Sequence, residues 1–284
     1  MKKVLIVILN YHQHHFINDL IESLKRQIVS FEYKIVIGDI DPTQEEVREI
    51  NKLILNHKKE PIIYEKIEQN IGYAKGNNYL IKKYSELYPP DYVVISNSDI
   101  ELIDKNCLLV MFNELESNQN VSVVGPKILS KEGKLQGPYN RMTINRILIK
   151  NLIPPFYYLI RKKEKNTFKN LSQKTYVWRI MGCFFMIDFF DFKQVDFFDE
   201  KTFLYWEEDI LSYKLEKINR KVMYMPEVKV LHKHESESIS RKFNEYDFES
   251  MLRYFEIVGE EKFKISLIKF SSLIFKNFWQ YFLK

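Results

Sequence analysis

Two carboxylates that follow an apolar segment are the first candidates for chemistry. Tyr92–Ser96 is rich in β-branched residues and predicts a buried strand, after which Asp99 and Glu101 follow closely. Ligands of open α/β sheets bind beyond the carboxyl ends of the strands. Hard carboxylate oxygens there suit Mg²⁺ or Mn²⁺, which usually carry a phosphorylated ligand. The same residues also fit a helix N-cap, so the segment predicts either a metal–phosphate site or a simple cap.

The segment Asn70–Asn78 has a composition that favours close approach of the backbone to a ligand. It contains Gly72 and Gly76, and between them lies Ala74, the only alanine of the chain. Small residues at these positions would allow a helix to begin close to a bound molecule. A plain junction between a loop and a helix is the alternative, because Asn and Gly are common there.

Three consecutive carboxylates, Glu207, Glu208 and Asp209, follow aromatic residues. Mutual repulsion and desolvation raise the pKa of at least one carboxyl in such a group, which is one way to make a general base. The alternative is a helix N-terminus that carries acidic residues to suit the helix dipole. Further along, His232 ends the predicted strand Val228–Leu231, where it either completes a metal site, binds phosphate or is structural.

Several common site types are excluded or disfavoured. The first loop, Asn10–His15, lacks the glycines that a dinucleotide-binding turn needs, and the chain has no Walker A sequence. Its histidines lack the frame of a typical zinc site. The two cysteines, Cys107 and Cys183, are too few for a disulfide scaffold and fit a reduced, cytosolic setting. The apolar start is too short for a signal peptide, and we expect no membrane-spanning helix.

Alternating strands and helices must position these residues. The pattern predicts an α/β fold with a mostly parallel sheet flanked by helices. The predicted strands are 4–9, 33–38, 62–65, 92–96, 121–124 (closed by Gly125-Pro126) and 228–231, and the predicted helices are 16–27, 43–57, 74–84 and 106–116. Residues 129–174 have weaker periodicity and predict a long, partly helical excursion of a kind often used for function.

The net charge of +5 is unevenly distributed. Residues 137–181 contain ten Lys or Arg and one acid, and residues 262–284 contain five Lys and no acid, so the rest of the chain is acidic. Two basic surfaces suggest contact with anionic lipid or a phosphorylated partner. In the tail, apolar residues from Phe263 to Phe282 recur at helical spacing opposite a basic face. This pattern indicates an interfacial helix, with packing on the domain or in a dimer as the alternative.

Together these segments resemble the inverting family-2 glycosyltransferases of GT-A fold, particularly their bacterial rhamnosyltransferase-like branch. The resemblance runs in order over residues 1–240. The matching segments are Asn10-Tyr11, Asp39, the loop Asn70-x-Gly72-x-Ala74-x-Gly76-x-Asn78, Asn97-Ser98-Asp99, Gly125-Pro126, Trp178 to Gly182, Phe197 to Glu200, Phe203 to Glu208, and His232. The chain departs from the family pattern at Ile40, where Asn is usual, and in keeping a single Asp in the metal motif.

The resemblance implies roles for individual residues. It implies that the donor is bound by Asn10, Tyr11, Asp39, Asn70, Gly72, Ala74, Gly76, Asn78, Asn97 and Ser98. It implies a metal, Mg²⁺ or Mn²⁺, at Asp99 with help from Glu101 or His232, and an acceptor side at Trp178, Gly182, Trp206 and Glu207. Glu208 and Asp209 compete for the catalytic base, and we favour Asp209.

The implied activity is transfer of a hexosyl or rhamnosyl group, with inversion, from a UDP- or dTDP-sugar to a hydroxyl of a growing, lipid-linked bacterial surface polysaccharide such as a capsule or O-antigen. The implied organisation is a GT-A domain at 1–240, with an acceptor-side excursion at 129–178 and a helical membrane-association segment at 241–284. We expect a cytoplasmic protein at the inner face of the membrane, a possible homo-oligomer, without a nucleic-acid partner. A sugar nucleotidyltransferase and a non-catalytic membrane-associated α/β binding module are the competing functions.

Overall fold

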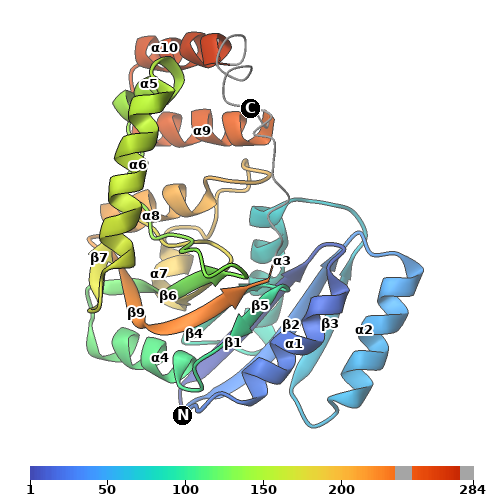
Figure 1. Cartoon of the computed structure of the whole chain (residues 1–284). Coiled ribbons are helices and arrows are strands. Elements are labelled where there is room, and N and C mark those ends of the chain that lie inside the picture. The colour runs from blue at the N-terminus through green and yellow to red at the C-terminus, as the bar shows by residue number, and fades with distance from the viewer. Residues whose placement is uncertain (234–244, 276–284) are drawn as a thin grey trace.

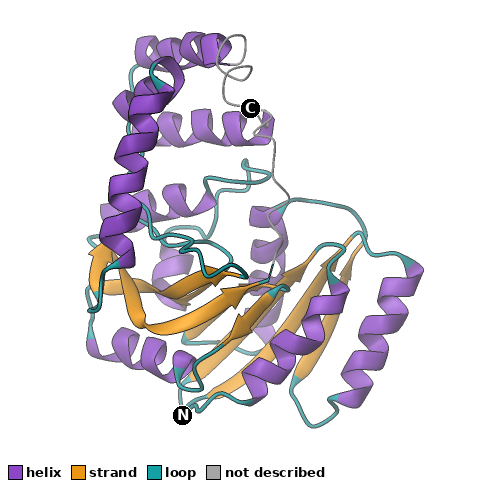
Figure 2. Cartoon of the chain, in the orientation of Figure 1, coloured by secondary structure: helices purple, strands orange, loops and turns teal. Residues whose placement is uncertain are grey.

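The computed structural model describes residues 1–233 and 245–275, and within them the strands form one nine-stranded sheet with helices on both faces (Figures 1 and 2). This confirms the predicted α/β fold. The strands are β1 (Lys3–Asn10), β2 (Glu32–Ile40), β3 (Ile62–Ile67), β4 (Tyr92–Asn97), β5 (Ile100–Leu102), β6 (Val121–Ser130), β7 (Thr175–Val177), β8 (Phe184–Asp188) and β9 (Lys221–His232). Their order in the sheet is β3-β2-β1-β4-β8-β6-β9-β5, with β7 also paired to β9.

The first half of the sheet is parallel and carries the N-terminal site residues to one edge. β3, β2, β1 and β4 pair in parallel. The apolar, β-branched runs of β1, β2 and β4 suit strands that are buried on both faces, whereas β3 at the sheet edge is only partly buried. The register sets Asn10 opposite Asp39 and Leu9 opposite Asn97. The polar residues that end these strands therefore lie side by side.

Helices cover both faces of the sheet. One apolar core lies between the sheet and α1 (His14–Lys25), α2 (Gln44–Asn56) and α4 (Cys107–Ser117). A second core lies on the opposite face, with α3 (Tyr73–Leu87), α7 (Phe189–Gln194) and α8 (Glu207–Lys217). α2 begins with a capping box in which Thr43 and Glu46 exchange hydrogen bonds.

The second half of the sheet is mixed, in contrast to the mostly parallel sheet expected. β8 runs antiparallel to β4 and β6, and β5 and β7 run antiparallel to β9. The prediction that a strand closes at Gly125-Pro126 is wrong, because β6 continues to Ser130 beside β9. A register irregularity follows Pro126, which is how a sheet accommodates a proline that cannot donate a hydrogen bond.

The excursion is partly helical, as expected, and stands with the C-terminal helices at one end of the molecule (Figure 1). It contains α5 (Ile144–Leu152) and α6 (Pro154–Lys169), and the C-terminal helices are α9 (Glu245–Val258) and α10 (Lys262–Ile274). α9 packs on α8, and α10 packs on α5, where the Asn151 side chain donates hydrogen bonds to Ser271 and Ser272. None of the helices in residues 1–233 and 245–275 has the length and apolar character needed to cross a membrane.

Candidate functional site

The edge formed by β1 and β2 holds a buried carboxylate. Asp39 is buried, and its two oxygens accept hydrogen bonds from Asn10 Nδ2 at 2.8 Å and from the Tyr64 hydroxyl at 3.1 Å. Burial raises the pKa of Asp39, although both hydrogen bonds act against the rise. Tyr11 follows at the end of β1 and is half exposed. Three of the residues expected to bind the donor, Asn10, Tyr11 and Asp39, therefore lie together.

The small residues of the loop before α3 allow the loop and the helix to pack closely against neighbouring segments. Gly72 has φ +81°, and a Cβ there would meet the Phe203 carbonyl oxygen at 2.5 Å. Ala74 is fully buried, and a Cβ on Gly76 would touch Leu9 at 3.0 Å, so both residues let α3 lie close to the sheet. The Asn70 side chain accepts a hydrogen bond from the Gly72 N–H and shapes the loop.

Asn78 and Tyr73 connect this loop to distant segments. The Asn78 amide donates to the Phe198 carbonyl and to Glu200, and it accepts from the Phe198 N–H. The Tyr73 hydroxyl donates to the Gly182 carbonyl at 2.7 Å. Asn78 therefore holds the 197–200 segment, while Tyr73 extends toward the cavity described below.

Asp99 and His232 form a buried pair at the ends of β4 and β9. β5 pairs with β9 so that Ile100 lies opposite His232, which places Asp99 Oδ2 3.2 Å from His232 Nε2. His232 Nδ1 lies 2.6 Å from Gln136 Oε1. Burial alone would lower the pKa of His232, but hydrogen bonds to Asp99 and Cys183 outweigh it and raise the pKa to about 10.

Glu101 lies apart from this pair. Its carboxylate is 2.8 Å from Lys233 Nζ and 3.6 Å from a guanidinium nitrogen of Arg26. Ser98 is buried in the turn between β4 and β5, and Asn97 donates its N–H to the Cys183 carbonyl. Of the three predicted metal ligands, Asp99 and His232 lie together, whereas Glu101 forms ion pairs with basic side chains.

The side chains of Asp99 and His232 offer one suitable ligand for a divalent ion. Among the residues that the structure describes, no three His, Cys, Asp or Glu side chains gather as a metal site. The Asp99 carboxylate is a suitable hard ligand. His232 would have to lose a proton before its imidazole could bind a metal. Asp99 therefore fits as a protein ligand, and further oxygens would have to come from a bound ligand or water.

The acidic segment begins α8 behind a strained turn. Tyr205 and Trp206 have φ values of 73° and 69°, a left-handed conformation that is unfavourable for bulky residues. The Trp206 indole donates to Asp247 Oδ1 at 2.9 Å, so α9 holds the turn in place. Glu207 is buried, and desolvation together with the charge of Glu208 raises the pKa of Glu207 to about 8.

Asp209 is engaged through both of its oxygens. Its Oδ1 accepts a hydrogen bond from the Trp178 indole at 2.9 Å, and its Oδ2 lies 2.6 Å from Arg179 Nε. The side chain is nearly inaccessible, and burial raises its pKa against the charge of Arg179. Asp209 is thus held in the wall of the site.

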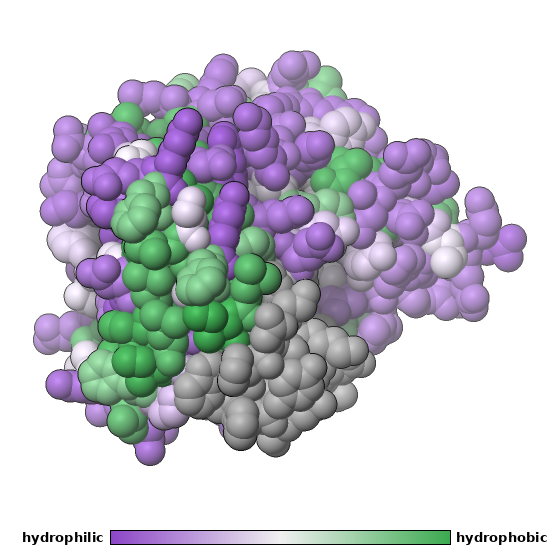
Figure 3. Space-filling view, turned by 90° about the horizontal axis from the view of Figure 1, so that it is seen from above, coloured by the Kyte–Doolittle hydropathy of each residue, from purple (hydrophilic) through white to green (hydrophobic). Residues whose placement is uncertain are grey.

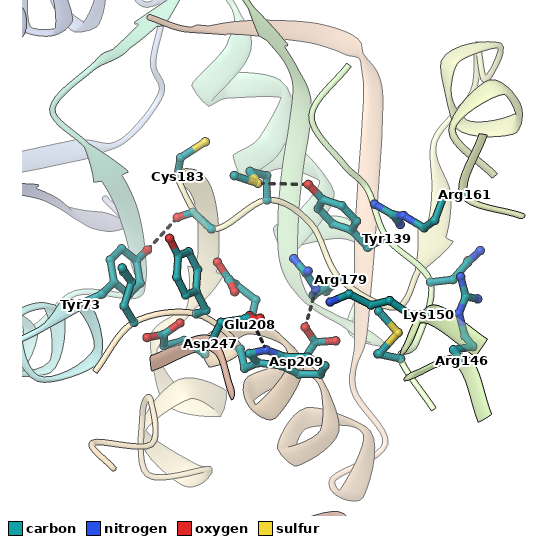
Figure 4. A pocket seen from close by; sticks show the side chains of 18 of the residues that line it. Tyr73, Tyr139, Arg146, Lys150, Arg161, Arg179, Cys183, Glu208, Asp209 and Asp247 are labelled. Carbon is teal, nitrogen blue, oxygen red and sulfur yellow. Dashed lines mark hydrogen bonds and ion pairs between the residues drawn. The ribbon is translucent and has the colours of Figure 1, made fainter. Parts of the chain in front are cut away.

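Glu208 faces a cavity of about 390 Å³ (Figure 4). A Cβ on Gly182 would lie 1.6 Å from Glu208 Oε1, so only glycine leaves room for this carboxylate. Burial raises the pKa of Glu208, and the charge of Arg179 opposes the rise. In Figure 4, Glu208 lies between Tyr73 and Cys183 on one side and a group of basic side chains on the other. A poised carboxylate at the centre of a cavity can take a proton from a bound hydroxyl.

Several residues that line this cavity carry no recognisable sequence motif. They are Tyr73, Tyr139, Arg146, Lys150, Arg161, Arg179 and Asp247. Most belong to the basic stretch 137–181, whose excess of cations was visible. That signal did not tell which cations point inward.

A sequence profile described as Glycosyl transferase family 2 matches residues 4–205. A search of curated protein sequences found no match. The match includes the ends of β1, β2 and β4 and the 70–78 loop, and it stops before the acidic segment of α8 and before His232.

Solved structures share the fold at low sequence identity. GalNAc-T7, solved with UDP, GalNAc and Mn²⁺, has a TM-score of 0.67 and 13% identity, covering 90% of this chain and 48% of that protein. The mannosyltransferase PcManGT from Pyrobaculum calidifontis, with GDP-Man and Mn²⁺, has a TM-score of 0.61 and 11% identity, covering 95% of this chain and 69% of that one. TarS 1–349 from S. aureus has a TM-score of 0.60 and 16% identity, covering 97% and 70%. The chain spans about half the length of the first, and these matches establish a GT-A-like fold.

Proposed function

Because the chain belongs to glycosyl transferase family 2, we propose that it moves a hexosyl or rhamnosyl group, with inversion, from a UDP- or dTDP-sugar to an acceptor hydroxyl. The observation that carries the proposal is the position of Glu208. This carboxylate faces a cavity that has Cys183, which is hydrogen-bonded to Asn97, on one side and Arg146, Lys150 and Arg161 on the other. A donor on one side and an acceptor on the other would meet at Glu208.

The proposed donor site is the edge formed by β1, β2 and β4. Asn10, Tyr11 and Asp39 would contact the nucleobase side, and Asn97 and Ser98 would lie toward the sugar and phosphates. Asp99 would hold Mg²⁺ or Mn²⁺, which supplies Lewis-acid charge to a diphosphate when bound. Two structural neighbours were solved with Mn²⁺ and a nucleotide or nucleotide sugar, which supports this arrangement. A role for Glu101 as a metal ligand stays a prediction.

We assign the base to Glu208 and a positioning role to Asp209. The alignment of this acidic segment with the family pattern allowed either residue as the catalytic base, and we favoured Asp209 from the sequence. The contacts favour Glu208, because the oxygens of Asp209 are already engaged by Trp178 and Arg179. Glu208 would accept the proton of the acceptor hydroxyl. At the same time the hydroxyl oxygen would form a bond to the anomeric carbon, and the bond from that carbon to the nucleoside diphosphate would break on the opposite face. A single displacement of this kind inverts the anomeric configuration.

An apolar surface supports a membrane-bound acceptor. Exposed apolar side chains of α5, α6 and their connection are Leu152, Ile153, Phe156 and Leu159, and those of α10 are Phe263, Leu267, Phe270 and Leu273. Figure 3 shows apolar side chains gathered at this end of the molecule. α10 buries Ile268, Ser271 and Ser272 instead, so its large apolar residues face outward. We propose that this apolar surface binds the inner face of the membrane, where a lipid-linked polysaccharide precursor would be the acceptor.

The part of the predicted interfacial helix that comprises Lys276, Phe278, Trp279, Gln280, Phe282 and Lys284 lies outside the described residues. The outward face of α10 carries the membrane proposal without it. Lys262 and Lys269 are exposed on the same helix and would meet anionic head groups.

Ligand binding tests the function most simply. The full chain is titrated with UDP, dTDP and their sugar conjugates in the presence of Mn²⁺, and thermal stability and nucleotide release are followed. The proposal predicts stabilisation by one nucleoside diphosphate and its slow release from the matching sugar conjugate. Formation of a nucleotide sugar from a nucleoside triphosphate and a sugar 1-phosphate would instead identify a nucleotidyltransferase. Absence of nucleotide binding would favour a non-catalytic module.

A further inference from the structure

The turn that leads into α8 combines backbone strain with an exposed aromatic ring. Tyr205 and Trp206 both have positive φ, and both line the cavity that Glu208 faces. Strained conformations persist where the surrounding structure enforces them, and they gather at ligand sites. A second strained pair, Asp196 and Phe197, has an evident packing reason, because the Phe197 ring is buried in the core. Tyr205 is 40% exposed, so burial of its ring does not account for its strain.

Helix α9 fixes this turn. The Trp206 indole donates to Asp247 Oδ1 at 2.9 Å, and the Ser250 hydroxyl donates to the Leu204 carbonyl at 3.0 Å. The Trp206 ring also packs against Tyr254, with the ring centres 5.4 Å apart. Asp247 itself reaches the wall of the cavity (Figure 4). A helix that lies outside the residues matched by the family profile therefore helps to shape the cavity.

The turn is also tied to the surroundings of the proposed base. The Tyr73 N–H donates to the Phe203 carbonyl at 2.9 Å, and the Tyr73 hydroxyl donates to the Gly182 carbonyl at 2.7 Å. Gly182 is the residue whose missing side chain leaves room for Glu208. Because Glu208 also follows the turn directly in α8, the position of Tyr205 relative to this carboxylate is fixed from two directions.

The cavity carries charges of both signs. Its charged lining residues are the acids Glu207, Glu208, Asp209 and Asp247 and the bases Arg146, Lys150, Arg161 and Arg179. Charge alone therefore does not select an anionic ligand. Hydrogen-bonding groups combined with an exposed aromatic ring suit a sugar, because its hydroxyls can bind the polar side chains while its C–H face lies against the ring.

We propose that Tyr205 binds a sugar ring of the acceptor against its aromatic face, and that Asp247 positions Tyr205 through Trp206. The inference rests on the proposed function, since that function makes the acceptor a glycan. A sugar on the Tyr205 ring would lie beside Glu208, the proposed base. The left-handed turn then places the aromatic ring in the cavity, and the contacts with α9 offset the strain of doing so.

Direct sugar binding to the full chain tests the site. Saturation-transfer NMR titrations are made with the donor site filled by UDP or dTDP and Mn²⁺. The probes are the methyl glycosides of glucose, galactose, N-acetylglucosamine and rhamnose. The variants are Tyr205→Gly, Tyr205→Phe, Asp247→Leu and Asp247→Asn. The control is Tyr176→Ala, which removes a Tyr that is 48% exposed on β7 and does not line this cavity.

The proposal predicts that at least one glycoside binds the wild-type protein. Tyr205→Gly should weaken that binding by about tenfold, the size expected for loss of one aromatic contact, while Tyr205→Phe and Tyr176→Ala keep it within about twofold. Because glycine accepts positive φ, the melting temperature of Tyr205→Gly should stay the same or rise. A residue that only stabilises the fold would lower it.

The two Asp247 variants separate the hydrogen bond from the carboxylate charge. Asp247→Leu leaves the Trp206 indole without its acceptor and should weaken glycoside binding at least about threefold. Asp247→Asn keeps an oxygen for the indole and should retain binding within about twofold. Loss of binding in both variants, or in neither, would contradict a positioning role through Trp206.

The inference would be overturned if no methyl glycoside bound, if Tyr205→Gly bound it as the wild type does, or if Tyr205→Gly lost stability together with binding. The proposed function is judged separately by nucleotide binding. If neither UDP nor dTDP binds, that function fails, and glycoside titrations of the protein without nucleotide still decide whether Tyr205 binds a sugar.

Discussion

The Oδ2 atom of Asp209 lies 2.6 Å from Nε of Arg179, and its Oδ1 atom accepts the indole N–H of Trp178. A carboxylate held in this way is poorly placed to receive a proton from a substrate. It can instead fix Arg179, whose charge acts on the neighbouring Glu208. The two acids of one helical turn thus have different tasks.

The substitution Asp209→Asn should weaken the enzyme without abolishing it. Asn keeps an oxygen for Trp178 but leaves Arg179 without its buried counter-charge, which costs about 3 kcal/mol of unfolding free energy. We expect turnover to fall about tenfold to a hundredfold, because Arg179 is no longer held by Asp209 and Glu208 is then less well positioned. Turnover and urea unfolding are measured on the same preparation. A folded Asp209→Asn protein with no turnover would indicate that Asp209, and not Glu208, is the catalytic base.

The substitution Gly182→Ala should displace Glu208. The added Cβ would lie 1.6 Å from Glu208 Oε1, so the carboxylate must move. Gly182 has no positive φ, and alanine is therefore compatible with its backbone. We expect turnover to fall at least about a hundredfold, the range associated with a general base, while the melting temperature changes little. Retained turnover would show that the position of Glu208 is not critical.

The acid side of the pH–rate profile should depend on Arg179. Burial raises the pKa of Glu208, and Arg179 lowers it in part. A base works when it is deprotonated, so activity rises with pH through this pKa. Removing the positive charge in Arg179→Gln raises the pKa of Glu208 further, and we expect the acid limb of kcat/KM to move to higher pH.

Arg179→Lys is the matched control for this shift, since it keeps the charge and should leave the limb near its original position. Both profiles are recorded at a temperature at which circular dichroism shows folded protein. An acid limb that stays in place in Arg179→Gln would contradict the assignment of that limb to Glu208.

The exposed apolar residues of α6 and α10 should determine membrane binding. Phe156 and Phe270 are 52% and 64% exposed. Replacing both by Ser should weaken flotation with anionic liposomes by about tenfold for each residue. The control is Phe190→Ser, which removes a Phe that is 65% exposed on α7, outside this apolar surface. Unchanged flotation of the double variant, or of a chain that ends at Glu261, would contradict the membrane proposal.

The sequence was sufficient for the elements with strong local patterns. β1, β4 and the middle of β2 are continuous apolar runs, and α1 places Ile17, Leu20, Ile21 and Leu24 on one buried face. β8 was missed because Phe184–Asp188 lies in an aromatic stretch without a clear period. β6 was ended too early because a Gly-Pro pair usually stops a strand, whereas here a register irregularity accommodates it.

Part of the site was predictable because some of its residues lie in recognisable local segments. The segments around Asp99, His232 and Glu208 could be recognised by their order along the chain. The inward direction of Arg146 and Lys150 could not, because it depends on how α5 packs against α10 through Asn151, Ser271 and Ser272. The roles of Glu208 and Asp209 also depend on tertiary partners, Trp178 and Arg179, that no local pattern identifies.

The most direct test of the account is nucleotide release by Glu208→Gln. Purified wild-type protein, Glu208→Gln and the control Glu216→Gln, which changes an exposed acid on the same helix, are incubated with UDP- and dTDP-sugars and Mn²⁺. Nucleoside diphosphate release is measured alongside UDP binding. If Glu208 is the base, Glu208→Gln should bind UDP as the wild type does but release nucleotide at least about a hundredfold more slowly, with Glu216→Gln unaffected. Release by Glu208→Gln at the wild-type rate would contradict that assignment.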